Sequence, residues 1–451
     1  PNIENKSSMG ERLDSVRSTS YENALIVLAS ESVDEMKAAV RIIEENGGSV
    51  NNIFPPHVLI GAFPRSKADA LVGQFGIEGI YYGAVDIAQF RRYGDLARNG
   101  LDFWNRKYFG LDKRPELSEI GAVDPGPIQD DSRFDSRIEL NQSIGSTMVR
   151  QNASAMILQG AATMPYGAGF YDTSEYMLGG ITVLMIFPES SGAIDQNTET
   201  WTQSDMDAVF AEIIQGVNWW KDREPNAHLS FTFAYYPPSQ TLTSYEPISR
   251  SSNDQYLWIS EIMNNLGFIS YGYYLDKVRE ANNYVRDYFG TDWAYTVFVV
   301  NSKNDLDGMF TDGYFAYAYL GGPFMVMTYD NYHYGLANMD AVTAHEMGHT
   351  FYAADEYYEP GYNDPGYPSD KWGYLAVENQ NLQGPGRSGS SDVQCIMRGG
   401  VSPYTSGAIC YYTRGHVGWR DSNSNGVMDI LDFYPENTIT SSPSSPTLDT
   451  T

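Results

Sequence analysis

The stretch His345-Glu346-Met347-Gly348-His349, followed by Asp355-Glu356, carries the clearest pattern in this chain of 451 residues. Two histidines four residues apart lie about 40° apart around an α-helix and roughly 6 Å along its axis, so both imidazoles can reach one metal ion. The preceding run 336–344 favours a helix, with Asn338 as the expected N-cap. The chain contains only six His, and two of them fall in this frame with a Glu between them. The spacing therefore predicts a helical zinc site at His345 and His349.

The third zinc ligand depends on where this helix ends. On a continuing helix, Asp355 would point about 120° away from His349, and Glu356 would lie about 10 Å too far along the axis. Zinc–oxygen distances of about 2 Å therefore require the chain to leave the helix soon after His349. A turn that folds back would bring Asp355 to the metal, while Glu356 and the more distant Glu378 remain as alternatives.

The H-E-x-x-H arrangement is that of zinc peptidases, in which the Glu takes a proton from water at the metal. The interval from His349 to Asp355 resembles the metzincin pattern H-E-x-x-H-x-x-G-x-x-[HD], but Tyr352 stands where the helix-breaking Gly is expected. Tyr disfavours a positive φ, so we expect a turn that is built differently here. Metzincins also place a Met in a tight turn beneath the zinc, and Met397, shortly before a Gly pair, resembles it.

The text around 345–357 and 395–400 also looks like the secreted bacterial metallopeptidases related to immunoglobulin A peptidases. The resemblance implies a secreted endopeptidase that uses Zn²⁺ and acts on protein or peptide substrates. Glu346 would act as the general base on water and then pass the proton to the leaving amine. Two other classes stay open, namely a surface adhesion protein with structural zinc and calcium, and a zinc hydrolase of a non-peptide substrate. The intact Glu346 favours catalysis, since a structural site needs no base.

The length and net charge of the chain limit the number of domains, the partners and the location that we expect. A chain of 451 residues is expected to form at least two domains. The net charge of −28 makes nucleic acid an improbable partner and suits a secreted, cation-binding protein. No stretch of about 18 apolar residues predicts a membrane span. The start at Pro1 is not a signal peptide, but it is compatible with the removal of one, and nothing in the sequence indicates an oligomeric state.

The two cysteines, Cys395 and Cys410, flank the segment that contains Met397. Their closeness in the sequence and the secreted character of the chain predict a disulfide, which would stabilise the fold by roughly 3 kcal/mol. The alternative is a pair of buried free thiols.

The expected fold class is α/β (α+β), with a ferredoxin-like domain ahead of a metzincin-like zinc peptidase domain. Hydrophobic patterning over 22–87 predicts the order βαββαβ, which resembles the inhibitory propeptides of subtilisin-type proteases. A flexible N-terminus is expected over 1–21 and a connector with little periodicity over 88–160.

The peptidase domain is expected over 161–435, with alternating strands and helices ahead of the zinc helix. Ser204 is expected to cap a helix in this region. An edge strand at Leu320–Met327 is expected to bind an extended peptide, although an ordinary core hairpin is equally compatible. His416 is expected at the surface or behind the metal ligands.

The segment 421–432 has the spacing of a Ca²⁺ loop, with oxygen ligands at positions 1, 3, 5, 9 and 12, a Gly at 6 and a backbone carbonyl at 7. It ends in Asp rather than Glu, as dockerin-like loops do, and the alternative is an Asx-rich turn. The Ser/Thr/Pro-rich tail 436–451 is expected to be a linker. The predicted calcium ligands are Asp421, Asn423, Asn425, Val427, Asp429 and Asp432.

Overall fold

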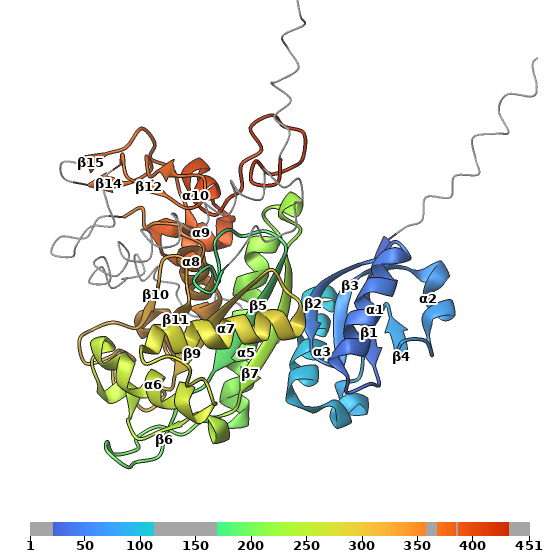
Figure 1. The fold of residues 1–451 in the computed structure, drawn as a ribbon, viewed down its shortest axis with the longest axis horizontal. Helices are drawn as coiled ribbons and strands as arrows, with labels where there is room; N and C mark the ends of the chain where they lie inside the picture. The colour runs from blue at the N-terminus through green and yellow to red at the C-terminus, as the bar shows by residue number, and fades with distance from the viewer. Residues whose placement is uncertain (1–20, 112–168, 358–367, 385–386, 433–451) are drawn as a thin grey trace, which may run out of the picture. The chain divides into compact units, whose positions relative to one another are not determined.

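The computed structural model describes residues 21–111, 169–357, 368–384 and 387–432 (Figure 1). The chain is of mixed α/β class and divides into two compact units, 1–112 and 113–451. The expected linker tail 436–451 lies outside the described residues, as does most of the expected connector. No helix in the described ranges has the length and hydrophobicity that crossing a bilayer requires.

The first unit contains the βαββαβ order expected from its patterning. Its strands form an antiparallel sheet in the order β2-β3-β1-β4, and β1 is completely buried from Ala24 to Leu28. Helix α1 is capped by Ser32, whose hydroxyl accepts the backbone N–H of Glu35. The elements are β1 Tyr21–Leu28, α1 Val33–Glu45, β2 Ser49–Phe54, β3 Val58–Pro64, α2 Arg65–Leu71 and β4 Ile77–Tyr81.

The first unit is longer than expected, because helix α3 (Gly94–Phe109) belongs to it. The expected connector therefore begins after this helix rather than at residue 88. The helix closely approaches the sheet at Gly100, where an added Cβ would lie 2.6 Å from the Phe54 ring. Its buried Asn105 exchanges two hydrogen bonds with the backbone of Val85, both at 2.9 Å. Buried asparagines and a glycine interrupt the apolar stripe of α3, so the hydrophobic periodicity of the sequence does not indicate a helix here.

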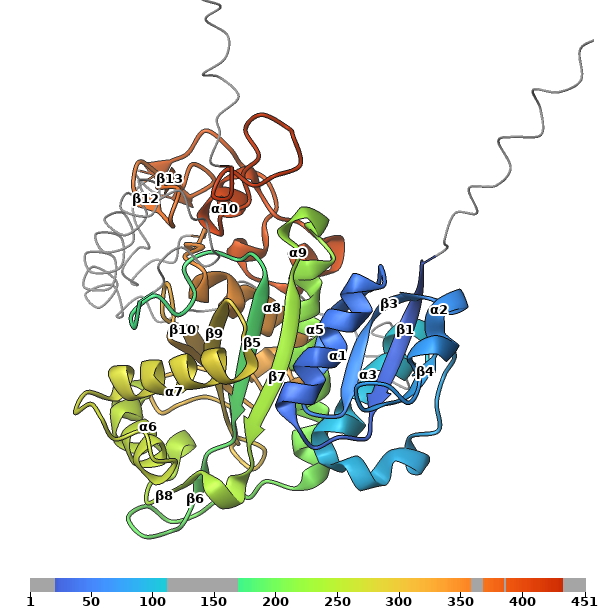
Figure 2. The same cartoon turned by 45° about the vertical axis from the view of Figure 1, so that its right-hand side comes forward.

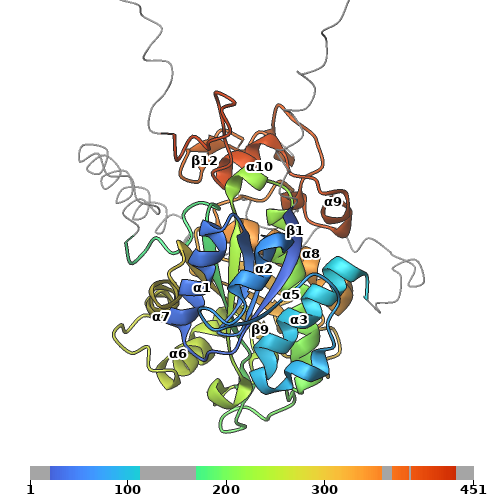
Figure 3. The same cartoon turned by 90° about the vertical axis from the view of Figure 1, so that its right-hand side faces the viewer.

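The second unit is built on a sheet of order β10-β11-β9-β5-β7, parallel except for the antiparallel strand β10. Strands β5 and β7 lie side by side over their full lengths (Figure 2). Helices α6 and α7 cover one face, while α5 and α8 lie on the other (Figures 1 and 3). The burial of both faces explains the nearly continuous apolar runs of the central strands. The strands are β5 Gly180–Ile186, β7 Ser230–Tyr236, β9 Trp293–Val300, β10 Ala316–Ala318 and β11 Phe324–Thr328.

Two expectations about this sheet are wrong in detail. Strand β11, which begins at Phe324 and covers the second half of Leu320–Met327, pairs with β10 on one side and β9 on the other, so it cannot add a peptide strand. Helix α5 is capped by Thr202 rather than Ser204, because the Thr202 hydroxyl accepts the N–H of Asp205. The helices are α5 Gln203–Lys221, α6 Gln255–Asn265, α7 Tyr274–Phe289, α8 Met339–Thr350, α9 Val401–Ser406 and α10 Tyr411–His416.

Short elements complete the second unit, one strand pair before helix α8 and two pairs after it. They are the strand pairs β6 Glu189–Ser190 with β8 Leu242–Thr243, β12 Lys371–Trp372 with β13 Val377–Glu378, and β14 Gln383–Gly384 with β15 Arg387–Ser388. A 3-10 turn, η9, runs over Ile396–Arg398.

Candidate metal centre

Helix α8 is buried along its whole length between the sheet and α5. Gly216 of α5 permits this approach, because an added Cβ would lie 2.5 Å from the carbonyl oxygen of Asp340. The indole N–H of Trp220 donates to the carbonyl of Ala344 at 2.8 Å. Asn338 occupies the N-cap position as expected, but its side-chain amide donates to the carbonyl of Tyr334 instead of capping the helix. Close packing rather than capping therefore holds α8 in place.

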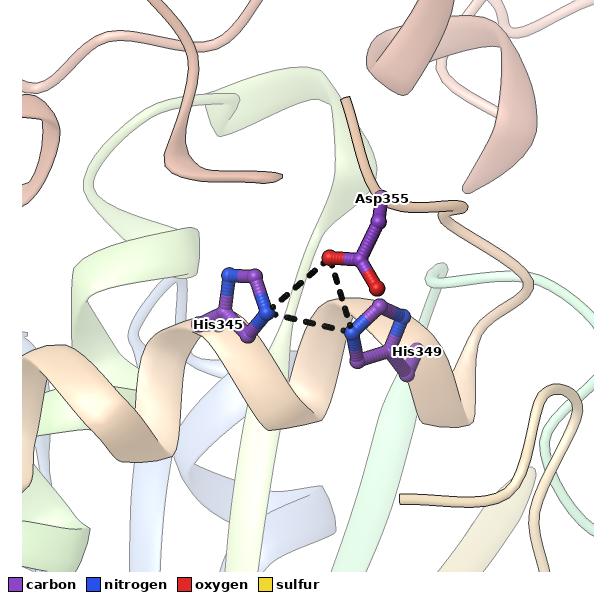
Figure 4. A group of neighbouring side chains, drawn as sticks. All are labelled: His345, His349 and Asp355. Atoms are coloured by element: carbon purple, nitrogen blue, oxygen red, sulfur yellow. Dashed lines mark hydrogen bonds and ion pairs between the residues drawn. The ribbon is translucent and has the colours of Figure 1, made fainter. Parts of the chain in front are cut away.

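The side chains of His345, His349 and Asp355 converge on one point (Figure 4). The two Nε2 atoms are 3.1 Å apart, and Asp355 Oδ1 lies 3.3 Å from His345 Nε2 and 3.5 Å from His349 Nε2. Tetrahedral zinc with bonds of about 2.0–2.2 Å separates its ligand atoms by about 3.3–3.5 Å. The donor set and its spacing fit a zinc ion without rearrangement. We call these three residues the tripod.

Backbone carbonyls orient both imidazoles. His345 Nδ1 donates to the carbonyl of Ile396 at 2.9 Å, and His349 Nδ1 donates to the carbonyl of Ala353 at 2.7 Å. A carbonyl can only accept, so the proton is on Nδ1 and the Nε2 lone pair points into the tripod. Burial raises the pKa of Asp355, and the two rings in their protonated, metal-free form lower it below its usual value through the charge of His349 and hydrogen bonds from both Nε2 atoms. The carboxylate is therefore ionised, as a metal ligand requires.

The turn that returns Asp355 to the helix corrects the expectation about Tyr352. Tyr352 adopts a φ of 69°, the left-handed conformation that a glycine would favour. Its N–H donates to the carbonyl of His349 at 2.9 Å, and the N–H of Ala353 donates to that of Gly348 at 3.0 Å. These two bonds form a Schellman motif with Tyr at the position after the C-cap. The turn therefore has the geometry that a Gly would give, and it is built with a Tyr.

Tertiary contacts hold Tyr352 in this conformation. Its ring is 7 % exposed and packs with Leu320 and Trp372, and its edge lies directly against the backbone of Gly321. Its hydroxyl bonds to the carboxyl of Glu175, whose pKa is raised to about 8 by burial. Left-handed backbone costs a non-Gly residue about 1–2 kcal/mol. Burial of a large aromatic side chain gives more than this.

Glu346 and Met397 complete the surroundings of the tripod. Glu346 follows His345 in α8 and is fully buried. Met397 lies beneath the helix, where a Cβ added to Gly348 would meet its sulfur at 2.6 Å. This is the placement expected for the Met turn. The ring of Tyr357 lies 6.5 Å from that of His345, centroid to centroid.

The alternative third ligands lie elsewhere. Glu356 points into a separate group with Cys395 and Cys410, and Glu378 in β13 bonds to the side chain of Gln380. Neither belongs to the tripod. Both cysteines are free and buried, so the expected disulfide is not formed and the alternative of two thiols holds. The thiol of Cys410 donates to the Glu356 carboxylate at 2.8 Å, a partner that the sequence did not indicate.

The predicted calcium loop, 421–432, is closed by its own side chains. The Asp421 carboxylate accepts the backbone N–H of Asn425 at 3.1 Å. The Asp432 carboxylate accepts the side-chain amides of Asn423 and Asn425 at 2.8 and 3.2 Å. These contacts bring the start and the end of the loop together.

The other predicted calcium ligands, Asp429 and Val427, bond to other residues of the loop. Asp429 accepts hydrogen bonds from Ser422, and the N–H of Val427 donates to the amide oxygen of Asn425 at 2.7 Å. Within the described ranges, the groups of three or more metal-ligating His, Cys, Asp or Glu are the tripod and the Glu356 group, so the three Asp of the loop do not converge.

His416 is not at the surface but completely buried. Its Nε2 lies 3.2 Å from the carbonyl oxygen of Glu378, and burial lowers its pKa to about 4. It therefore serves as a neutral core histidine rather than as an exposed one.

No protein-family model, no curated protein and no solved structure matches this chain.

Proposed function

We propose that this chain is a zinc-dependent metalloendopeptidase. The observation that carries the proposal is the tripod of His345, His349 and Asp355, whose three donor atoms lie 3.1–3.5 Å apart with Glu346 next to His345 on the same helix. A structural zinc site is normally closed by four protein ligands, whereas a catalytic site has three and leaves one position open. Within the described ranges no fourth metal-ligating side chain joins the tripod.

The residues of the centre divide the chemistry between them. The tripod would hold the zinc ion, which polarises a substrate carbonyl and acidifies water when bound. Ile396 and Ala353 orient the imidazoles through their carbonyls. Glu346 acts as the general base that takes a proton from water and returns it to the leaving amine. Its burial favours this role, because a dry site strengthens the interactions of a charge with its surroundings.

The architecture supports a metzincin-like assignment of the second unit. The zinc helix ends in a turn that brings back an Asp six residues after the second His, and Met397 packs beneath the same helix. The edge strand for an extended peptide would be β10 (Ala316–Ala318), which stands at the end of the sheet order among the described strands. The order and pairing of the strands in the first unit support a ferredoxin-like domain.

Three further features of the proposed enzyme concern its location, its calcium loop and its first unit. The net charge of −28 favours an extracellular protein, and the spacing of oxygen-bearing side chains over 421–432 supports a calcium ion as a stabilising ligand. The first unit would restrain or assist the catalytic unit, as propeptides do. Comparing the activity and folding of 161–435 with and without the separately added segment 22–112 tests this role, and equal behaviour would leave an accessory domain.

Cleavage of denatured protein, measured with and without a zinc chelator, tests the proposal against its two alternatives. A metallopeptidase loses activity with the chelator and recovers it with added zinc. A surface binding protein cleaves nothing under either condition. A zinc hydrolase of another substrate class leaves the protein intact but hydrolyses ester or amide model compounds in a chelator-sensitive way.

A further inference from the structure

A second group of metal-binding side chains lies directly behind the tripod. Glu356, Cys395 and Cys410 are 1 %, 0 % and 4 % exposed, and Thr413 is fully buried beside them. Cys410 Sγ donates to Glu356 Oε1 at 2.8 Å, and the Thr413 hydroxyl donates to the same oxygen at 2.9 Å. Cys395 Sγ lies 3.2 Å from the Thr413 hydroxyl. We call these four residues the thiol cluster.

The donor atoms of the cluster have the spacing of a metal site. One carboxylate oxygen and the two sulfurs lie within 4.8 Å of one another. Zinc–sulfur bonds of about 2.3 Å and zinc–oxygen bonds of about 2.1 Å in a tetrahedron separate the donors by about 3.6–3.8 Å. The observed contacts reach these separations by movements of less than about 1 Å, which side chains can make without a change of backbone.

We propose that Cys395, Cys410 and Glu356 bind a second, structural zinc ion, with the Thr413 hydroxyl as a fourth polar group. Binding releases the two thiol protons to solvent, and no electrons are transferred. Two soft thiolates select zinc over calcium or magnesium. Without the metal both thiols keep their protons and bond within the group, and with it the cation balances the thiolates that binding creates.

This site would hold the catalytic centre from behind. Glu356 follows the tripod residue Asp355 directly, and its N–H donates to the carbonyl of Met397 at 2.9 Å. Cys395 precedes Ile396, whose carbonyl accepts the Nδ1–H of His345. One ion bound to Glu356 and Cys395 would therefore restrain the chain next to Asp355 and next to Ile396. The inference does not depend on peptidase activity, since the cluster contains none of the tripod residues.

The first experiment counts zinc in the full chain purified under reducing conditions. Wild type is expected to contain two zinc ions per chain, and one should remain both in His345→Ala and in the double variant Cys395→Ser/Cys410→Ser. Replacement of zinc by cobalt gives sulfur-to-cobalt charge-transfer absorption only where thiolates bind the metal. This absorption is expected in wild type and in His345→Ala, and it should be absent from the cysteine variant.

Measurements on wild type and on His345→Ala can overturn the inference even if the cysteine variant does not fold. His345→Ala without zinc, cobalt protein without sulfur charge transfer, or an intact mass lower by two hydrogens, which indicates a disulfide, would each refute it. These results can be distinguished from a failure of the proposed peptidase function. A protein that cleaves no peptide would still show the sulfur-to-cobalt absorption if the thiol cluster binds metal.

A gain-of-binding variant sharpens the test. Thr413→Cys places a third sulfur next to Glu356 Oε1, so the metal should resist a competing chelator at about tenfold higher concentration and the charge-transfer band should grow. Thr405→Cys is the matched control, because it adds a thiol at an exposed position of α9. Equal behaviour of the two variants would contradict the site.

Discussion

The conformation of Tyr352 gives a quantitative test of how the third ligand reaches the metal. Tyr352→Ala removes a ring that is 7 % exposed, a loss that costs about 3–5 kcal/mol of unfolding free energy for large aromatic residues. It leaves the backbone at a φ of 69°, where only glycine is unstrained. Tyr352→Gly loses the same contacts but relieves a strain of about 1–2 kcal/mol. The glycine variant should therefore be more stable than the alanine variant by about 1 kcal/mol, after its larger chain entropy is subtracted.

Urea unfolding of the zinc-free protein measures this difference without a contribution from metal binding. Tyr352→Phe separates the hydroxyl from the ring, and loss of the bond to Glu175 should cost about 1–3 kcal/mol. All three variants should also bind zinc more weakly, by about tenfold or more, because Asp355 is held less firmly. If the alanine variant is as stable as the glycine variant, the chain does not use a positive φ here and the account of the turn fails.

Three further predictions concern the tripod, a buried acid and the calcium loop. Asp355→Ala should lower zinc-dependent activity more than about 100-fold and far more than Glu356→Gln does, and the reverse order would exclude Asp355 as the third ligand. Burial raises the pKa of Glu175 from its ordinary value of 4.5 to about 8 in the folded chain, so the unfolding free energy should fall as pH rises through that window. Denaturation of Glu175→Gln at several pH values should show a weaker dependence than wild type, and equal slopes would argue against a buried acid. Calcium should raise the melting temperature by several degrees relative to a calcium chelator, and a shift that persists in Asp421→Ala would count against the loop 421–432.

Helix α8 and the placement of its two histidines were predictable from the sequence because the evidence for them is local. The positions of His345 and His349 on one face follow from helix geometry alone. The requirement that the chain leave the helix early also followed from geometry, and it favoured Asp355. The βαββαβ order was predictable for the same reason, since each element is short and has its own hydrophobic period.

The parts that the sequence did not predict depend on contacts between distant residues. Tyr352 looked unsuitable for the turn, but its partner Glu175 lies far away in the sequence. The pair Cys395 and Cys410 suggested a disulfide, and only the fold reveals Glu356 as the acceptor for a thiol. Helix α3 was missed because its buried face includes two asparagines, of which Asn105 pairs with the backbone of Val85.

Conversion of the general base, Glu346→Gln, tests the central claim most directly. Glutamine keeps the size of the side chain but cannot take a proton, so cleavage of a denatured protein substrate should fall by about 10²–10⁴-fold. The tripod is untouched, so the zinc content of the variant should equal that of wild type. A variant that keeps its zinc and still cleaves at the wild-type rate would contradict the assignment of this chain as a metallopeptidase.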